Sequence, residues 1–283
     1  CSDCWHKYNA IIISSLIQRN QTGRAVFEQN CRIPAELKEI GVYENALVHK
    51  NKCLSLFCGS AETPLIYGDI APSKSRNAVP CTATGCKWPK SGDYVYIPVY
   101  ISSSYTSAER NIIIRGLVSF HSSTCIRFVW RTSHVDYLYF YSGTGCWSYL
   151  GRQGGLQAVS LRNNGCLYHS TVQHEVSHAL GFHHEQVRSD RDSYVQVLPQ
   201  NIIPGYEHNF EKIQTNNLGT PYDFNSVMHY TKYAFSKNGQ PTLLSKANPS
   251  LDFGRATSMS ANDIARINKL YGCSDKKQVD ESD

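Results

Sequence analysis

Residues 174–185 read HEVSHALGFHHE, and this stretch decides the fold. His174 and His178 are four residues apart, so a helix presents both on one face, where two ring nitrogens can bind one metal ion at about 2.0–2.1 Å. Gly181 can adopt the left-handed conformation that ends a helix, after which the chain turns back and brings in His184. Three neutral nitrogen ligands leave one position open, which is typical of a catalytic zinc site.

Glu175 follows the first of these histidines and is placed to take a proton from a water molecule at the open position. His183 is an alternative third ligand, although the spacing from Gly181 favours His184. An amphipathic helix whose histidines only fill surface or core positions is the alternative for the whole stretch. The full pattern H-E-x-x-H-x-x-G-x-x-H is far more specific than H-E-x-x-H alone. We therefore expect the three histidines to hold one zinc ion.

A second motif, Ser226-Val227-Met228-His229-Tyr230, has the form S-x-M-x-Y and contains one of the two methionines of the chain. A methionine-containing turn beneath a three-histidine zinc site is typical of the metzincin peptidases. Together with Phe182 and Glu185, these motifs make the sequence resemble the astacin family of zinc endopeptidases. The resemblance covers about residues 77–273 and includes the segments 145–152 and 188–195.

The resemblance implies a role for each residue of the two motifs. The three histidines would hold zinc, with Glu175 as the general base. Tyr230 would be an additional zinc ligand in the resting enzyme and would move away to stabilise the oxyanion when substrate binds. The alternative for Tyr230 is a core aromatic, because the chain has 18 tyrosines. Met228 would pack under the metal as an apolar floor.

Residues 1–76 are expected to form a propeptide with an aspartate switch near its end. Ile66-Tyr67-Gly68-Asp69 resembles the astacin propeptide motif F-x-G-D, with Ile66 in place of the usual phenylalanine. In that family the aspartate binds the zinc and displaces the catalytic water. A carboxylate is a competent zinc ligand, and a preceding glycine allows close backbone approach. An ordinary Gly-Asp turn is the alternative.

A basic linker, Lys74-Ser75-Arg76, follows the Gly-Asp motif and is expected to be open to a trypsin-like activating protease. Cleavage after Arg76 would produce a mature enzyme that begins at Asn77. The resemblance implies that this new N-terminus lies near Glu185. The alternative is that Glu185 only orients neighbouring groups.

Length and composition describe a globular protein with more than one part. The chain has 283 residues, of which 41% are hydrophobic and 18% are charged. The net charge is +5 and the Lys and Arg residues are scattered, so we expect no nucleic-acid partner. The longest apolar run, residues 10–17, is too short to span a bilayer, and no signal peptide is visible.

Eleven cysteines indicate an oxidising compartment and therefore a secreted protein. Six of them follow residue 77, and sequence alone does not choose their pairing. Zinc ligation is an alternative, but none of these six forms a C-x-x-C pair. Similarity to astacins implies three disulfides: Cys81–Cys86, Cys125–Cys273 and Cys146–Cys166. The first pair resembles the six-cysteine, hatching-enzyme-like branch of bony fishes.

Local sequence patterns predict strands before the zinc motif and irregular chain after it. The expected strands span residues 94–102, 125–131, 137–142, 146–150 and 157–161. A capping box at Thr106 opens a helix to about Ser119, and residues 170–180 form the zinc helix. Ser260 caps a final helix through Tyr271. Residues 186–225 are expected to be mostly loop.

This order predicts an α+β, astacin-like domain of two lobes, with the zinc helix at the cleft. The peptidase domain would span residues 77–273, followed by a polar, disordered tail at 274–283. The resemblance implies that an extended peptide adds to the rim strand at 146–150, where Trp147 and Tyr149 line subsites or serve as core aromatics.

The function expected from these features is endopeptidase action on protein substrates, with egg-envelope or extracellular-matrix protein as a candidate. Two alternatives come from other classes. One is a catalytically silent relative that binds egg coat or matrix. The other is a zinc hydrolase that acts on non-peptide substrates.

Overall fold

The structure, a computed structural model, describes residues 65–73 and 86–274. The predictions for Arg76, Asn77, Cys81, most of the propeptide and the polar tail after Ser274 lie outside the described residues. Among the helices of the described part, none combines the length and the apolar character needed to cross a bilayer.

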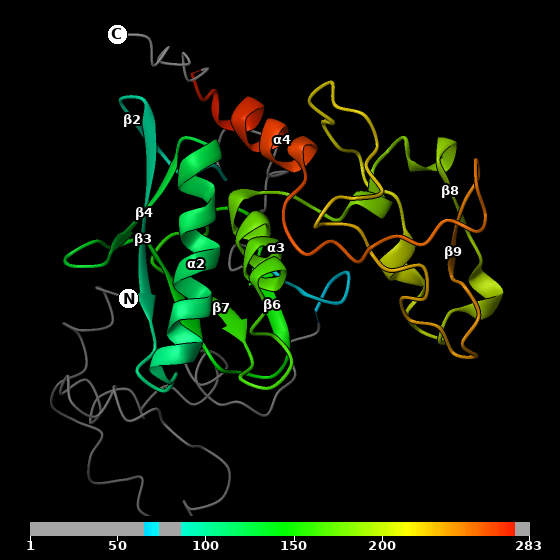
Figure 1. The fold of residues 1–283 in the computed structure, drawn as a ribbon, viewed down its shortest axis with the longest axis horizontal. Helices are drawn as coiled ribbons and strands as arrows, with labels where there is room; N and C mark the ends of the chain where they lie inside the picture. Colours follow the sequence, from blue (N-terminus) through cyan, green and yellow to red (C-terminus); the bar gives the residue numbers. More distant parts are fainter. Residues whose placement is uncertain (1–64, 74–85, 275–283) are drawn as a thin grey trace, which may run out of the picture. The chain divides into compact units, whose positions relative to one another are not determined.

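Seven strands of the described part form one sheet in which parallel pairs predominate (Figure 1). In chain order they are β1 (Ile70–Ala71), β2 (Lys90–Ser91), β3 (Tyr94–Ile101), β4 (Ile126–Trp130), β5 (Tyr137–Tyr141), β6 (Cys146–Tyr149) and β7 (Leu156–Leu161). Strand β3 has the most partners: it pairs in parallel with β4 and β5 and antiparallel with β2, and β5 pairs in parallel with β7. Strand β6 runs antiparallel to β7, and β1 adds in parallel to the other edge of β6.

The alternation of apolar side chains explains which face of the sheet is buried. In β3, Val95, Ile97 and Val99 are buried, whereas Tyr94 and Tyr96 on the opposite face are exposed. Successive side chains of a strand point to opposite faces, so one face contributes to the core and the other carries tyrosines. Helices α2 and α3 lie beside each other along this sheet (Figure 1).

The described part has three α-helices. They are α2 (Ser107–Ser123), α3 (His169–Leu180) and α4 (Ala261–Tyr271). The backbone N–H of Thr106 donates to the Glu109 carboxylate at 2.7 Å, which completes the predicted capping box of α2. Helix α2 continues one turn beyond the predicted end at Ser119. The fully buried Phe120 accounts for the extension, because tertiary packing outweighs the weaker helix propensity of the serines around it.

Residues 185–260 form a lobe with little regular structure. Residues 186–225 are mostly loop, as expected, and contain short 3-10 turns and one strand of a two-stranded ladder. The turns are η3 (Glu185–Val187), η4 (Arg191–Ser193), η5 (Pro199–Asn201) and η6 (Glu207–Phe210), and the ladder pairs β8 (Val195–Val197) with β9 (Leu243–Ser245). This lobe has its own apolar cluster, which includes Ile202, Phe210 and Phe253. In Figure 1 the β8–β9 ladder lies on the opposite side of α3 from the sheet, which gives the two lobes expected from the sequence.

Two disulfides connect elements that are distant in the sequence. Cys125–Cys273 joins the start of β4 to the end of α4, across 148 residues. Cys146–Cys166 joins β6 to the segment before α3. These are two of the three pairs that the resemblance implies; Cys81, the expected partner of Cys86, lies outside the described residues.

Gly116 allows α2 to pack closely on α3. A Cβ atom at this position would lie 2.4 Å from Cγ1 of Val172, too close for any real contact. We expect Gly116→Ala to lower the free energy of unfolding by about 1–3 kcal/mol because of this overlap, although the same change inside a helix normally stabilises by about 1 kcal/mol. Denaturant unfolding with intact disulfides measures the change.

Val172→Ala provides the matched control for this prediction. Combined with Gly116→Ala, it should recover part of the loss, with a coupling energy of about 0.5–3 kcal/mol. Strictly additive effects of the two substitutions would show that this contact does not limit the helix packing.

Candidate metal centre

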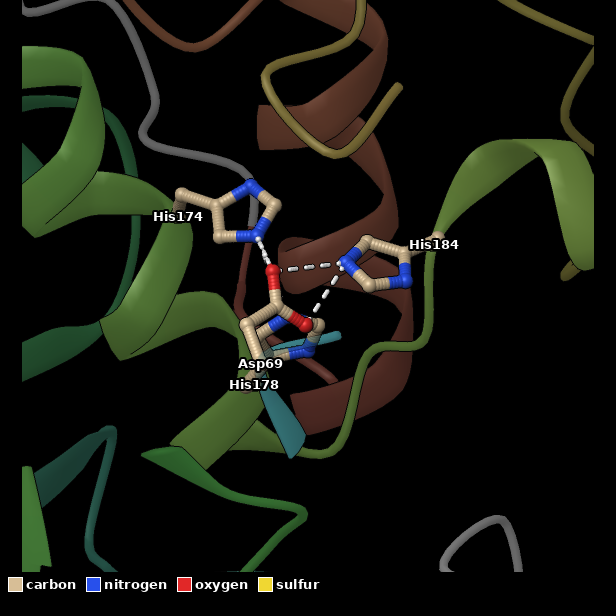
Figure 2. A group of neighbouring side chains, drawn as sticks. All are labelled: Asp69, His174, His178 and His184. Atoms are coloured by element: carbon tan, nitrogen blue, oxygen red, sulfur yellow. Dashed lines mark hydrogen bonds and ion pairs between the residues drawn. The ribbon is translucent and has the colours of Figure 1, made fainter. Parts of the chain in front are cut away.

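Three histidines and one aspartate meet at a single point between the lobes of the described chain. Figure 2 shows the Asp69 carboxylate between the rings of His174, His178 and His184. Its oxygens lie 3.0 Å from Nε2 of His174 and 3.0 Å from Nε2 of His184. The corresponding distance to Nε2 of His178 is 3.4 Å. The ligand atoms of all four residues lie within 4.8 Å of one another.

The local fold of the zinc motif explains this convergence. His174 and His178 lie one turn apart on α3, and their ring centroids are 4.7 Å apart. Gly181 ends the helix with a φ of 108°, a left-handed conformation that glycine adopts without strain. The chain then returns, so that His184 packs edge-on against His178, with ring centroids 4.8 Å apart. The spacing argument from the sequence therefore matches the observed geometry.

Hydrogen bonds to backbone carbonyls determine where the ring protons lie. Nδ1 of His174 donates to the carbonyl of Val227 at 2.8 Å, and Nδ1 of His178 donates to that of Phe182 at 2.7 Å. A carbonyl can only accept, so each ring carries a proton on Nδ1. In a neutral ring the Nε2 lone pair is therefore free to face the centre. Burial lowers the pKa of His178 to about 4, which keeps this ring neutral at neutral pH.

These residues fit a zinc ion. The Nε2 atoms of His174 and His178 are 3.1 Å apart, close to the separation of about 3.4 Å expected for two nitrogens on one tetrahedral zinc. Two lone pairs at this distance repel each other unless a cation lies between them. Imidazole nitrogen and carboxylate oxygen are both common zinc ligands.

His183, the alternative third ligand, does not belong to this group. Its ring contacts the ring of Tyr67 edge-on, with centroids 5.8 Å apart. Within the described residues, His184 is therefore the third histidine of the cluster, as the spacing from Gly181 predicts.

Glu175 lies beside the metal centre in an open cavity of about 340 Å³. The cavity is also lined by Asp69, His174, Val227 and Gly254. The Glu175 side chain is buried, and its Oε2 has no hydrogen-bond partner in the described part of the chain. Burial, together with the nearby Asp69 charge, raises the pKa of Glu175 well above its usual range. A carboxylate with a free oxygen at this position can accept a proton from a reacting water.

Tyr230 lies on the other side of the centre, with its ring centroid 4.6 Å from that of His184. Its hydroxyl donates a hydrogen bond to the backbone carbonyl of Tyr67. Burial raises the pKa of Tyr230, so the phenol keeps its proton. The backbone of Tyr230 lies so close to Gly254 that a Cβ atom there would come within 2.1 Å of its carbonyl oxygen.

The turn around Met228 connects the two lobes behind the cluster. Met228 is buried, and its carbonyl accepts the N–H of Glu185 at 2.9 Å. This bond ties the residue after His184 to the methionine turn. The packing of the Met228 side chain under the metal stays a prediction.

Both carboxylate oxygens of Glu185 accept hydrogen bonds from neighbouring groups. Arg266 binds both of its carboxylate oxygens, through Nη2 at 2.8 Å and through a shorter bond from Nη1. Nη1 of Arg188 lies at 3.2 Å and the N–H of Asp223 at 2.7 Å. These contacts favour the orienting role for Glu185. A role in binding the N-terminus at Asn77 stays a prediction, because Asn77 lies outside the described residues.

Residues 66–70 form a turn at the centre, closed by two hydrogen bonds between Ile66 and Ile70, and residues 70–71 then pair with the rim strand. Cα partners are Ile70 with Ser148 and Ala71 with Tyr149. The N–H of Ser148 donates to the carbonyl of Asp69 at 3.0 Å. Trp147 is half-buried and Tyr149 is buried; their rings contact each other edge-on, with centroids 5.8 Å apart. The strand expected on the rim thus does pair with an extended chain, which here is residues 70–71.

Gly68 is required by the close approach of this segment to the lower lobe. Its φ is +82°, and a Cβ atom would lie 2.8 Å from Cζ of Phe235. The glycine before Asp69 therefore serves the close backbone approach inferred from the sequence.

Sequence reasoning missed three residues that support the centre, namely Arg188, Arg266 and Asp263. The two arginines neutralise Glu185 from positions 3 and 81 residues away in the sequence, and no local pattern indicates such a pairing. Asp263 was visible only as the third helical residue after the Ser260 cap. Its second set of partners, in the methionine turn, arises from tertiary structure.

Comparison with known proteins gives consistent matches. A family model described as Astacin, a peptidase family, matches residues 83–272. High choriolytic enzyme 1 of Oryzias latipes is 47% identical over 211 residues, which are 74% of this chain and 78% of that enzyme. Low choriolytic enzyme of the same fish is 43% identical over 212 residues, again 74% of this chain and 78% of the relative.

A solved structure is also similar. It is that of high choriolytic enzyme 1 (HCE-1), described as a hatching enzyme zinc-protease from Oryzias latipes; the TM-score is 0.67 and the identity 48%, over 70% of this chain and 100% of that chain. The residues matched by the family model contain the three histidines of the cluster. This chain therefore belongs to the astacin family of zinc metalloendopeptidases.

Proposed function

We propose that this chain is a secreted zinc endopeptidase made as a latent zymogen. Residues 1–76 would be the propeptide and residues 77–273 the catalytic domain. The observation that carries the proposal is the convergence of three histidine Nε2 atoms on one point, with the free carboxylate oxygen of Glu175 beside it. The two disulfides of the described part agree with an oxidising, extracellular environment.

Each residue of the centre has a distinct task in peptide hydrolysis. His174, His178 and His184 hold the metal. A bound zinc ion would act as a Lewis acid on the scissile carbonyl and make a water molecule more acidic. Glu175 accepts the proton of the attacking water and passes it to the leaving amine. The Tyr230 phenol donates a hydrogen bond to the oxygen on which negative charge develops.

The hydrogen bond of Tyr230 supports this last role. In the described structure the Tyr230 hydroxyl donates to a peptide carbonyl, that of Tyr67, next to the histidine cluster. A substrate carbonyl at a similar position would receive the same donor. We also propose that Tyr230 binds the metal in the resting enzyme that lacks residues 65–73.

Three contacts of residues 65–73 would keep the uncleaved chain latent. Asp69 fills the position among the histidines that a water molecule needs. The Tyr230 hydroxyl donates its hydrogen bond to the carbonyl of Tyr67 and is therefore not available to a substrate carbonyl. Strand β1 pairs with the edge of β6, to which a substrate would add. Cleavage between Arg76 and Asn77 by a trypsin-like protease would allow all three contacts to be released.

The rim strand β6 favours an extended polypeptide as substrate, and Trp147 and Tyr149 would contact its side chains. The relatives are named choriolytic enzymes, which supports an egg-envelope protein as the physiological substrate. A catalytically silent binding protein would not need both Glu175 and the Tyr230 phenol at the cluster. A small-molecule hydrolase would not need an open strand edge beside the metal centre.

Activation and metal removal test the proposed function directly. We expect the untreated chain to leave casein intact and the trypsin-treated chain to hydrolyse it after the trypsin has been inhibited, with Asn77-Ala78-Val79 at the new N-terminus. A chelator should abolish hydrolysis, and added zinc should restore it, because the metal is needed for the chemistry. Casein assays, N-terminal sequencing and metal analysis are the measurements. Activity that persists without metal would refute the proposal.

Glu175→Gln tests the general base. The substitution removes the proton acceptor but leaves the three histidines in place, so kcat should fall by a factor of about 10²–10⁴ while one zinc per chain is retained. Glu211→Gln, at an exposed glutamate of the other lobe, is the control and should behave like the parent. Near-normal turnover of Glu175→Gln would refute the assigned base.

Asp69→Asn tests the switch in a chain that cannot be cleaved, which carries Lys74→Gln and Arg76→Gln. Loss of the anionic ligand should raise hydrolysis of a short fluorogenic peptide above the background of the uncleavable parent. Asp93→Asn, a change at an exposed aspartate, is the control and should stay at background. If Asp69→Asn is as inactive as the parent, latency does not depend on this carboxylate.

A further inference from the structure

We infer that Ser226 and Asp263 are positioning residues for the metal centre and act on His174 through a relay of hydrogen bonds. The inference rests on the proposed role of His174 as a metal ligand. Ser226 begins the methionine turn and lines the same cavity as His174 and Glu175. Asp263 belongs to α4, far along the chain from His174, and is not one of the four residues whose ligand atoms converge.

The relay has three links that pass through one peptide unit. Nδ1–H of His174 donates to the carbonyl of Val227 at 2.8 Å. The N–H of the same peptide unit, that of Met228, donates to Oγ of Ser226 at 3.0 Å. The Ser226 hydroxyl in turn donates to Oδ1 of Asp263 at 2.6 Å. Each donor therefore points away from the metal and towards the carboxylate.

The direction of every link follows from the chemistry of the groups. A carbonyl only accepts and an amide N–H only donates, which determines the first two links. Because Oγ of Ser226 already accepts from Met228, its proton is available for Asp263. Oδ2 of Asp263 accepts the N–H groups of Val227 and Ser260, each at 2.9 Å, so both of its oxygens serve as acceptors.

Burial makes the relay effective. Ser226 is fully buried and Asp263 is 5% exposed, so water competes little with these bonds. In such surroundings, hydrogen bonds that share a common direction strengthen one another. A carboxylate at the end of the relay makes the Val227 carbonyl a better acceptor and the His174 ring a stronger base at Nε2. This is the effect of a carboxylate bonded directly to a ligand histidine, here transmitted through a hydroxyl and a peptide.

The relay distinguishes His174 from the other histidines. Nδ1 of His184 has no hydrogen-bond partner in the described part of the chain, and Nδ1 of His178 bonds to a carbonyl at the end of its own helix. His174 is thus the ligand that the methionine turn and α4 hold in orientation. Ser226, the serine of the S-x-M-x-Y motif, thus connects the methionine turn to Asp263.

The competing explanation is that Asp263 only caps α4. It is the third residue of that helix and completes a capping box with Ser260. Helix α2 offers a matched control, because Glu109 completes the same kind of box with Thr106 and is far in sequence from the methionine turn. A cap-only role predicts the same behaviour for Asp263→Asn and Glu109→Gln.

Zinc affinity separates the two explanations. The full chain, as parent and with Ser226→Ala, Asp263→Asn or Glu109→Gln, is titrated with zinc in competition with a chromophoric chelator, and its thermal unfolding is followed without metal. We expect Ser226→Ala and Asp263→Asn to bind zinc about 10–100-fold more weakly than the parent. Glu109→Gln should lower the melting temperature but leave zinc affinity within about twofold. The NMR signal of the His174 Nδ1 proton should move upfield in Ser226→Ala, since its hydrogen bond weakens.

The outcomes are distinguishable. Unchanged zinc affinity in Ser226→Ala, with or without a lower melting temperature, would overturn the relay and leave Asp263 as a helix cap. Ser226→Ala removes a single oxygen atom and decides the test if Asp263→Asn does not fold. A parent chain that binds no zinc would instead contradict the proposed function, whatever the variants do.

Discussion

The structure depends on one electrostatic constraint: the Nε2 atoms of three imidazole rings converge on the same small volume, where the Asp69 carboxylate lies between them. Such an arrangement is unfavourable unless a cation balances it. The fold maintains it by fixing the opposite side of the rings, where backbone carbonyls bind the Nδ1 protons of His174 and His178. The turn at Gly181, the methionine turn and the return of the chain to His184 all serve this orientation. The metal site is therefore a property of the surrounding backbone as much as of its ligands.

Helix α4 has an unexpected place in this arrangement. Two of its residues, one turn apart, bind the two segments that complete the centre, namely the methionine turn and the residue after His184. Asp263 binds the methionine turn through Ser226 and Val227, and Arg266 binds Glu185 directly after the third histidine. The Cys125–Cys273 disulfide then attaches the end of α4 to the sheet. The C-terminal helix thus connects the upper lobe to the segments that complete the metal centre.

Local patterns predicted most of the upper lobe and nearly all of the cluster. The spacing of His174, His178 and His184, the glycine after the helix and the capping boxes are short-range signals, and the structure agrees with them. The lower lobe was poorly predicted, because its β8–β9 ladder joins three-residue strands whose pairing depends on tertiary contacts. The pairing of Arg266 with Glu185 and the hydrogen bonds between the methionine turn and Asp263 were missed for the same reason. Sequence spacing reveals neighbours on one helix, but not residues brought together across 81 positions.

If the segment at residues 65–73 leaves on activation, as proposed, strand β6 would also impose a cost on the enzyme. Its outer edge would then present unpaired N–H and C=O groups, which can bind any extended chain and not only a substrate. A second molecule of the same enzyme could pair there and be cut, or could start aggregation. While β1 is in place, it covers this edge at Ser148 and Tyr149. The segment would thus protect the colloidal stability of the protein during synthesis and storage, in addition to silencing its chemistry.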